Sequence, residues 1–191
     1  MLFEVIIRKK DGKMILCIAC SAEDGIPKKY LNDCKSVLNE LMCENDLVFG
    51  GSNRGIMGVA YRAAKKNQRK VIGACPKYYK DSLSELKCDQ EILTEKVLES
   101  TEIMIRKCDA IILMPGGLGT LYEFFLAIQG IICKEHTKPI VIYNSCGFFD
   151  DILDYLIKIK DKKFITEETF SSFSVANNST ELKKFISAIY Q

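Results

Sequence analysis

The sequence predicts an α/β fold, namely a doubly wound parallel sheet with helices on both faces. Short apolar runs alternate along the chain with helix-like segments of roughly 12–18 residues, which is the pattern of βαβ units. Residues 14–20 are apolar throughout, as in a strand that is buried on both faces. Two of the apolar runs end in glycine clusters. We therefore expect parallel strands joined by right-handed crossovers in a single domain, residues 1–191.

In the first third of the chain, the strand at 14–20 precedes a helix over 27–45, where apolar residues recur every three or four positions. A short strand at 47–49 ends in two glycines, and a helix over 52–66 follows, with Ser52 in its N-cap region. Residues 1–13 contain an Asp-Gly pair between apolar runs. This pattern fits either a hairpin strand or a flexible extension.

In the middle of the chain, residues 70–75 form the next predicted strand. Residues 76–89 are polar without clear periodicity, so we expect a loop there. Residues 91–106 carry apolar side chains at helical spacing and predict a helix. The apolar run 110–114 predicts a fourth strand.

The last third begins with a helix over 121–133, followed by a strand at 139–143. A helix is expected over 148–160, a short last strand over 172–176, and a C-terminal helix over 180–190 that starts with a Thr-x-Glu pattern.

Composition argues against several classes of protein. The 27 basic and 25 acidic residues give a net charge of +2 without a basic block, so we expect no nucleic-acid partner. No apolar run approaches the roughly 18 residues of a membrane span. Nine scattered cysteines suit reduced thiols in the cytoplasm, and we interpret the Cys17/Cys20 pair as buried small side chains. His136 is expected to be exposed, and we predict neither a metal site nor a cofactor.

The most informative stretch is Pro-Gly-Gly-Leu-Gly-Thr-Leu-Tyr-Glu at 115–123, between a strand and a helix. Glycines allow close approach of a ligand, and a helix N-terminus offers free N–H groups to a phosphate. Glu123 is expected on the first turn of the helix, beside the ligand, as the catalytic carboxylate. An acidic residue favoured by the helix dipole is the other interpretation. The predicted phosphate-binding residues here are Gly116, Gly117, Gly119 and Thr120.

A second glycine-rich turn at 50–58 follows an earlier strand and is predicted to form the opposite wall of the site. A tight turn or close helix packing also explains such a turn taken alone. It is neither a Walker sequence nor a clean G-x-G-x-x-G. The predicted binding residues of this turn are Gly50, Gly51, Ser52, Arg54, Gly55 and Met57.

These two motifs resemble those of the "lonely guy" (LOG) family, once widely labelled lysine decarboxylase: PGGxGTxxE at 115–123 and GGxxxGxMG at 50–58. The resemblance implies a Rossmann-like fold, a homodimer with the site near the subunit interface, and Glu123 as the catalytic residue. It implies a phosphoribohydrolase that cleaves the N-glycosidic bond of a nucleoside 5′-monophosphate, such as a cytokinin riboside monophosphate or AMP. Free base and ribose 5-phosphate are the products. Nothing in these residues indicates a pyridoxal phosphate site.

The chain departs from the family pattern at two places. An ungapped count puts Ser100-Thr101 where the family carries an Arg-Lys pair, so the guanidinium is missing. The first strand ends in a turn that contains Glu23 and Asp24, two acids close to the expected phosphate site, with Arg54 as partial compensation. Three hypotheses follow: an active hydrolase, a nucleotide-binding protein without hydrolysis, and an enzyme with other chemistry on a phosphoribosyl ligand.

Overall fold

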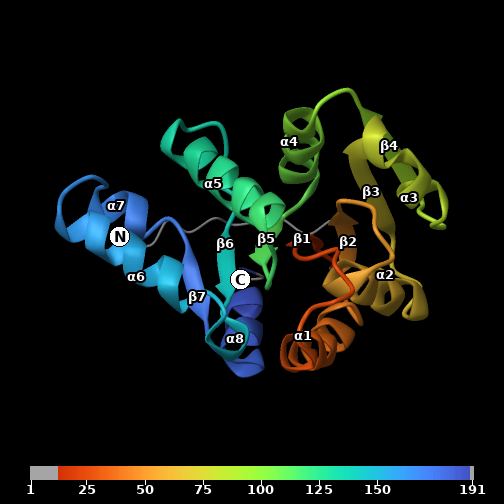
Figure 1. Cartoon of the computed structure of the whole chain (residues 1–191), viewed down its shortest axis with the longest axis horizontal. Helices are drawn as coiled ribbons and strands as arrows, with labels where there is room; N and C mark the ends of the chain where they lie inside the picture. Colours follow the sequence, from red (N-terminus) through yellow and green to blue (C-terminus); the bar gives the residue numbers. More distant parts are fainter. Residues whose placement is uncertain (1–12, 190–191) are drawn as a thin grey trace.

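The structure, a computed structural model, describes residues 13–189. Its described strands form one seven-stranded sheet in the order β4-β3-β2-β1-β5-β6-β7 (Figure 1). Every neighbouring pair is parallel, as the sequence predicted. The strands are β1 (Ile15–Ala19), β2 (Asp46–Phe49), β3 (Val71–Pro76), β4 (Gln90–Thr94), β5 (Ala110–Leu113), β6 (Ile140–Tyr143) and β7 (Ser174–Ala176). Residues 1–12, for which a hairpin strand or a flexible extension was expected, lie outside the described part.

The helices cover both faces of the sheet (Figure 1). One core contains buried side chains of α1, α2 and α8, and the other contains those of α4, α5 and α6. The longer helices are α1 (Lys28–Leu41), α2 (Gly55–Lys66), α4 (Val97–Lys107), α5 (Leu118–Ile132), α6 (Asp150–Asp161) and α8 (Ser179–Ile189). No helix within residues 13–189 is long and apolar enough to cross a bilayer.

The helix predicted over 91–106 was wrong in its first part. Residues Gln90–Thr94 form β4, an edge strand that pairs with β3, and α4 begins only at Val97. The carboxylate of Glu99 accepts the N–H groups of Glu95 and Lys96, at 3.0 and 3.4 Å, and so fixes the start of the helix. The helix was predicted partly from the spacing of Leu93 and Val97. These side chains are 39% and 51% exposed, so their spacing does not mark a helix face that packs on the core.

The predicted loop over 76–89 contains two short helices, η1 (Lys77–Tyr79) and α3 (Lys80–Ser84). Buried Leu83 holds this segment on the sheet, where it lies against Gly51. A further short helix, α7 (Glu167–Phe170), was also not predicted. The 3₁₀ turn η2 (Ser145–Gly147) precedes α6 and carries Cys146 at a φ of +50°.

Helix α5 begins three residues earlier than the sequence indicated. Gly117 is its N-cap and Leu118 its first residue, so Gly119 and Thr120 belong to the first turn. Glu123 is consequently on the second turn, not on the first. Helical side chains lean toward the N-terminus, so the Glu123 carboxyl is still directed back toward the glycine loop.

Candidate functional site

The candidate site lies where the strand order reverses, between β1 and β5. Strands on either side of this point send their helices to opposite faces, which opens a crevice beyond the carboxyl ends of the strands. The two strand exits are tied together, because the Ser21 amide donates to the carbonyl of Pro115 at 3.0 Å. The glycine loop at 115–119 therefore lies directly beside the turn that follows β1.

The glycines of this loop serve different purposes. A side chain at Gly116 would collide with Thr120, whose hydroxyl lies against it, so packing requires glycine at 116. A Cβ at Gly117 or Gly119 would meet nothing within 4 Å, and neither residue has a positive φ. Gly117 is also the N-cap of α5, a position that favours glycine, whereas open space at both residues leaves room for a ligand to approach the N-terminus of α5.

Glu123 is a half-buried carboxyl without an internal partner. Within residues 13–189 it forms no hydrogen bond and no ion pair. Burial raises its pKa to about 8. Burial and then the charge of Glu123 raise the pKa of the Cys20 thiol, which indicates that the carboxyl lies near the end of β1. An unpaired carboxyl with a shifted pKa beside a glycine loop is typical of a functional group.

The position of the missing Arg-Lys pair is occupied by buried hydroxyls. Ser100 and Thr101 are 3% and 2% exposed, and both donate to the carbonyl of Val97, at 2.8 and 3.1 Å. Both hydroxyl groups therefore donate their protons to the backbone of α4 and not to a ligand or to Glu123. No Lys or Arg among the described residues contributes to the pKa of Glu123. The expected cationic partner is thus absent from this part of the chain.

The glycine turn at 50–58 is engaged with the protein itself. Gly51 has a φ of +78°, and a Cβ there would lie 2.7 Å from Leu83. Gly55, at a φ of +56°, packs against the backbone of Ser21, and its amide donates to Asp24 at 3.0 Å. The Met57 amide donates to the carbonyl of Ser21 at 3.0 Å.

The remaining residues of this turn are also in internal contacts. The Ser52 hydroxyl accepts the Arg54 amide at 3.2 Å, and a side chain at Gly50 would touch Met57. The turn therefore holds the end of β1 in place, and the amides of Arg54, Gly55 and Met57 already donate hydrogen bonds within the protein. A direct contact of these residues with a phosphate stays a prediction.

Arg54 pairs with Glu23 and Asp24, the two acids near the expected phosphate site, and its single positive charge offsets part of their two negative charges. The Nε of its guanidinium donates to the Asp24 carboxylate at 2.8 Å, and the Glu23 carboxylate lies 3.8 Å from another guanidinium nitrogen. Hydrogen bonds from Arg54 and from the Gly55 amide hold the pKa of Asp24 below its usual range. The negative charge of these acids at the edge of the site is thereby partly offset.

A pocket of about 270 Å³ adjoins the glycine loop. Its walls come from three segments: the turn after β1 with the start of α1, the loop at 115–117, and Phe148 before α6. Tyr30 and Phe148 meet in this pocket with ring centroids 5.1 Å apart. Sequence reasoning missed both aromatics, because Tyr30 has ordinary helical spacing and Phe148 lies 118 positions away from it in the sequence.

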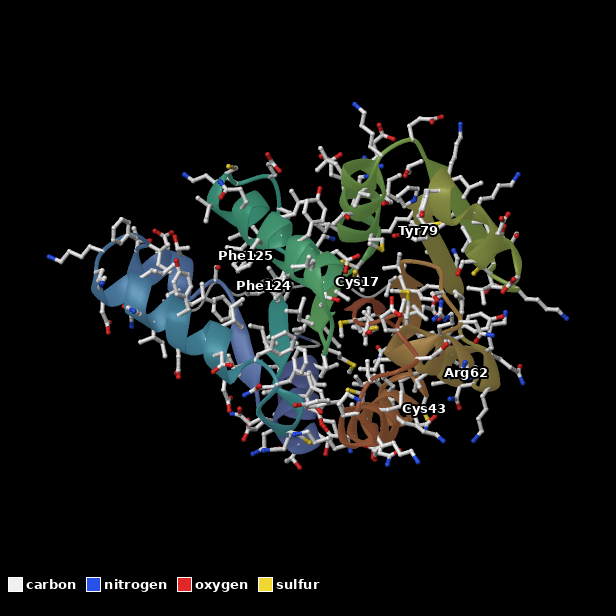
Figure 2. The ribbon with its side chains drawn as sticks, viewed as in Figure 1. Cys17, Cys43, Arg62, Tyr79, Phe124 and Phe125 are labelled. Atoms are coloured by element: carbon white, nitrogen blue, oxygen red, sulfur yellow. The ribbon has the colours of Figure 1, made fainter. Side chains whose placement is uncertain are left out.

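The described residues contain no cluster of three or more His, Cys, Asp or Glu side chains suited to a metal ion. His136, expected to be exposed, is instead partly buried, and its Nε2 lies against Gly130. Burial lowers the pKa of this imidazole. The Cys17 thiol is buried and hydrogen-bonded with Cys108, as a packed core thiol would be. Figure 2 labels Cys17 within the fold, away from the molecular outline.

Comparison with known proteins identifies the family. The family described as "Possible lysine decarboxylase" matches residues 57–186. Cytokinin riboside 5′-monophosphate phosphoribohydrolase LOG2 of Arabidopsis thaliana is 30% identical over 177 residues, which cover 90% of this chain and 81% of LOG2. The chain belongs to the LOG family. A second member, Arabidopsis LOG4, is 29% identical over 184 residues, covering 95% of this chain and 84% of LOG4.

Solved structures share the fold of this LOG-family chain. The molybdenum cofactor binding protein of Rippkaea orientalis superposes with a TM-score of 0.71 at 23% identity, covering 94% of this chain and 98% of that one. The molybdenum cofactor carrier protein of Chlamydomonas reinhardtii gives 0.67 at 18% identity, covering 92% and 99%. At these identities the likeness concerns the fold alone, and it agrees with the predicted Rossmann-like architecture.

Proposed function

We propose that this protein is a phosphoribohydrolase that cleaves the N-glycosidic bond of a nucleoside 5′-monophosphate and releases free base and ribose 5-phosphate. Membership in a family with cytokinin riboside 5′-monophosphate phosphoribohydrolases supports this proposal. The observation that carries it is the unpaired Glu123 carboxyl beside a glycine loop with two sterically unneeded glycines. A cytokinin riboside monophosphate or AMP is the proposed substrate.

The 5′-phosphate binds at the N-terminus of α5, where the amides of Gly119 and Thr120 belong to the first turn. This placement puts the ribose next to Glu123. Cleavage of the bond between C1′ and the base nitrogen builds positive charge on the ribose. The ionised form of Glu123, whose share grows as the pH rises toward its pKa of about 8, stabilises this charge and accepts a proton from the water that attacks C1′. The bond from C1′ to the base nitrogen breaks, the departing nitrogen takes up the proton that Glu123 returns directly or through solvent, and the oxygen of the water becomes the hydroxyl on C1′.

Purified protein incubated with a panel of nucleoside 5′-monophosphates tests this proposal. Free base and ribose 5-phosphate are expected in equal amounts from at least one monophosphate, and none from the matching nucleoside without phosphate. Glu123→Gln is expected to reduce product formation by about 10²- to 10⁴-fold. Release of base by the variant at the wild-type rate would contradict the assignment of Glu123.

A second candidate function, nucleotide binding without hydrolysis, is favoured by one observation. The hydroxyls of Ser100 and Thr101 are bonded to α4, and no cation of the described chain lies beside Glu123. This alternative predicts that a monophosphate raises the melting temperature while no base is released. The same panel therefore separates the two functions.

We also propose that the protein forms a homodimer through α5. The outer face of this helix carries Leu118, Tyr122, Phe125 and Ile132, which are 87%, 39%, 43% and 45% exposed. Their spacing places them along one side of the helix, so together they form an apolar surface that a second copy can cover. Figure 2 labels Phe125 together with its neighbour Phe124, which is buried beneath the helix.

The proposed compartment is the cytoplasm. All nine cysteines are free thiols in the structure, including exposed Cys43, Cys133 and Cys146, which supports a reducing environment.

A further inference from the structure

A second hollow lies at the amino ends of β3 and β4, on the edge of the sheet opposite the glycine loop. This basic hollow has a volume of about 550 Å³ and is lined by Lys65, Gln68, Arg69, Lys70 and Asp89. Lys70 directly precedes β3 and Asp89 directly precedes β4, two neighbouring parallel strands. Because β3 is six residues long and a strand rises about 3.3 Å per residue, roughly 15–20 Å separate the hollow from the edge that carries the candidate site.

Three Lys or Arg side chains and a single acid give the basic hollow an excess of positive charge. The acid is Asp89, whose carboxylate already accepts the Val71 amide at 2.8 Å and lies 3.6 Å from Lys65 Nζ. Asp46 is not part of the lining, and its carboxylate accepts the Lys70 amide at 3.0 Å. Within residues 13–189 the lining includes no aromatic or aliphatic side chain, so the hollow suits a highly charged ligand and not an apolar one.

The helix dipole explains only part of this charge. Basic residues in the last turn of a helix complement its negative end, and Lys65 and Lys66 of α2 fit that explanation. The carbonyl of Ala64 near this end already accepts the Arg69 amide at 2.9 Å. Arg69 and Lys70 follow the end of α2, so the helix does not need the charges of their side chains.

The two cations that follow α2 have donor groups available. Arg69 Nε donates to the carbonyl of Asn67 at 3.0 Å, which orients the guanidinium. Within the described part of the chain, the two terminal nitrogens of Arg69 and the Nζ of Lys70 form no hydrogen bond or ion pair. A guanidinium that is fixed at one nitrogen presents its remaining N–H groups in one plane, an arrangement that matches the oxygens of a phosphate group.

Gln68 brings an amide group to the basic hollow from a backbone position that favours glycine. It follows Asn67, the C-cap of α2, and has a φ of +54°. A side chain at such a position costs conformational energy that glycine avoids. Lys163 has the equivalent place after α6, at a φ of +65°, and does not line the hollow. The two positions therefore allow the backbone effect of a side chain to be separated from its effect on a ligand.

From this placement we infer that the basic hollow is a second anion site, which binds a diphosphate or triphosphate group. Lys65, Arg69 and Lys70 offset the several negative charges of such a group, and the Gln68 amide donates to one of its oxygens. The group belongs either to a free oligophosphate or to the phosphate chain of a nucleotide. The site is separate from the proposed 5′-phosphate position at α5 and does not depend on the proposed hydrolysis.

Calorimetry with tripolyphosphate and with ATP tests this inference. Each titration contains an excess of ribose 5-phosphate to occupy the proposed site at α5, and about 0.15 M salt to screen charges more than about 8 Å apart. The wild-type protein is expected to bind one tripolyphosphate per chain. Arg69→Gln and Lys70→Gln are each expected to weaken this binding about tenfold, because each removes charged donors to the ligand.

Two matched controls remove one positive charge each outside the basic hollow. Lys66→Gln changes the same turn of α2, and Arg106→Gln changes an exposed side chain in the last turn of α4. Both are expected to alter tripolyphosphate affinity less than about twofold. Asp89→Asn keeps an oxygen for the Val71 amide but removes the acid, and is expected to tighten tripolyphosphate binding several-fold.

The Gln68 side chain is tested by a change that is not expected to harm the fold. Gln68→Gly is expected to leave the melting temperature unchanged or higher and to weaken tripolyphosphate several-fold. Lys163→Gly is expected to have a similar effect on the melting temperature without an effect on binding. Equal affinities for ATP and tripolyphosphate indicate recognition of the phosphate chain alone, and tighter binding of ATP indicates a nucleotide as the ligand.

The inference is overturned if the wild-type protein does not bind tripolyphosphate, or if folded Arg69→Gln and Lys70→Gln bind it as tightly as the wild type. It is also overturned if Lys66→Gln and Arg106→Gln weaken binding as strongly, because the attraction is then a general effect of charge. Failure of the proposed function gives a different result. In that case no nucleoside monophosphate releases its base, while the losses in Arg69→Gln and Lys70→Gln persist.

Discussion

The Asp24 carboxylate accepts a hydrogen bond from the Arg54 guanidinium at 2.8 Å, across the gap between the exit of β1 and the turn before α2. The same carboxylate accepts the Gly55 amide at 3.0 Å. Asp24 thus takes a position at the N-terminus of α2 that an anionic ligand would otherwise favour. Arg54 acts as the counter-charge of this acid, so its contribution to an anion site is indirect.

This arrangement predicts how Arg54 affects ligand binding. Arg54→Ala leaves Glu23 and Asp24 uncompensated near the proposed phosphate position and is expected to weaken ribose 5-phosphate binding several-fold. Adding Asp24→Asn to Arg54→Ala is expected to restore most of the affinity, measured by calorimetry at low salt. If Arg54 contacts the phosphate itself, the second substitution restores nothing. Because both side chains of this pair are exposed, the stability of the protein is expected to change little.

Glu123 predicts a pH dependence of stability. Burial raises its pKa from the usual 4.5 to about 8, so between these values the folded state holds a proton that the unfolded state has released. The carboxyl therefore costs stability as the pH rises from about 4.5 to 8. Glu123→Gln removes this cost and is expected to stabilise the protein by about 1–3 kcal/mol more at pH 8.5 than at pH 4.5, after allowance for remaining solvent contact.

Thermal unfolding of both proteins across this pH range measures the effect, which corresponds to roughly 3–10 °C in melting temperature. Glu181→Gln is a suitable control, because hydrogen bonds from the Asn177 amide and the Asn178 side chain lower the pKa of Glu181. Its stability difference is expected to have the opposite sign. A difference for Glu123→Gln that is independent of pH argues against a buried, proton-holding carboxyl.

The two kinds of glycine predict opposite outcomes. The space around Gly119 is open and the residue belongs to the regular helix α5. Gly119→Ala is therefore expected to fold with unchanged or slightly higher stability. Its affinity for ribose 5-phosphate is expected to fall about tenfold, because the methyl group obstructs approach to the amides. Gly51→Ala places a methyl group against Leu83, at a residue whose φ of +78° strains any side chain. This variant is therefore expected to be less stable than the wild-type protein. Chemical denaturation measures the stability of both variants, and calorimetry on the same samples measures their affinity for ribose 5-phosphate. Unchanged affinity in Gly119→Ala would contradict the proposal that a ligand approaches the backbone at this glycine.

The apolar face of α5 predicts the oligomeric state. Phe125→Arg places a charge in the middle of this face and is expected to convert a dimer into monomers, as measured by light scattering after gel filtration. Tyr155→Arg on α6 changes a side chain that is 59% exposed outside this face and is expected to leave the dimer intact. A monomeric wild-type protein, or a dimer that tolerates Phe125→Arg, excludes this interface.

The central strands were predictable because their residues are apolar at successive positions, as at 110–114, and few structures other than a buried strand suit such a run. The edge strand β4 was not predictable in this way. Its exposed residues, among them Leu93, lack a core pattern, and the boundary depends on the Glu99 carboxylate folding back to residues 95 and 96. The hydrogen bonds of the Glu99 side chain thus determine where α4 begins, although the spacing of the apolar residues suggested an earlier start.

The glycine loop and Glu123 were visible in the sequence because their residues are contiguous. The aromatic pocket was not, since Tyr30 and Phe148 meet only when α1 and the end of β6 are brought together through Asp33. The neutralised state of Arg54 likewise depends on a contact between residues 30 positions apart. Local motifs are readable from sequence, whereas properties created by tertiary contact are not.

The Thr120 hydroxyl fills the space that a side chain at Gly116 would need, so these two positions form one steric unit. Enlarging the residue at 116 is compatible with the loop only when the residue at 120 shrinks at the same time. In a library that varies both positions, larger residues at 116 are therefore expected only in variants with a smaller residue at 120, and a scan of position 116 alone will find glycine to be required.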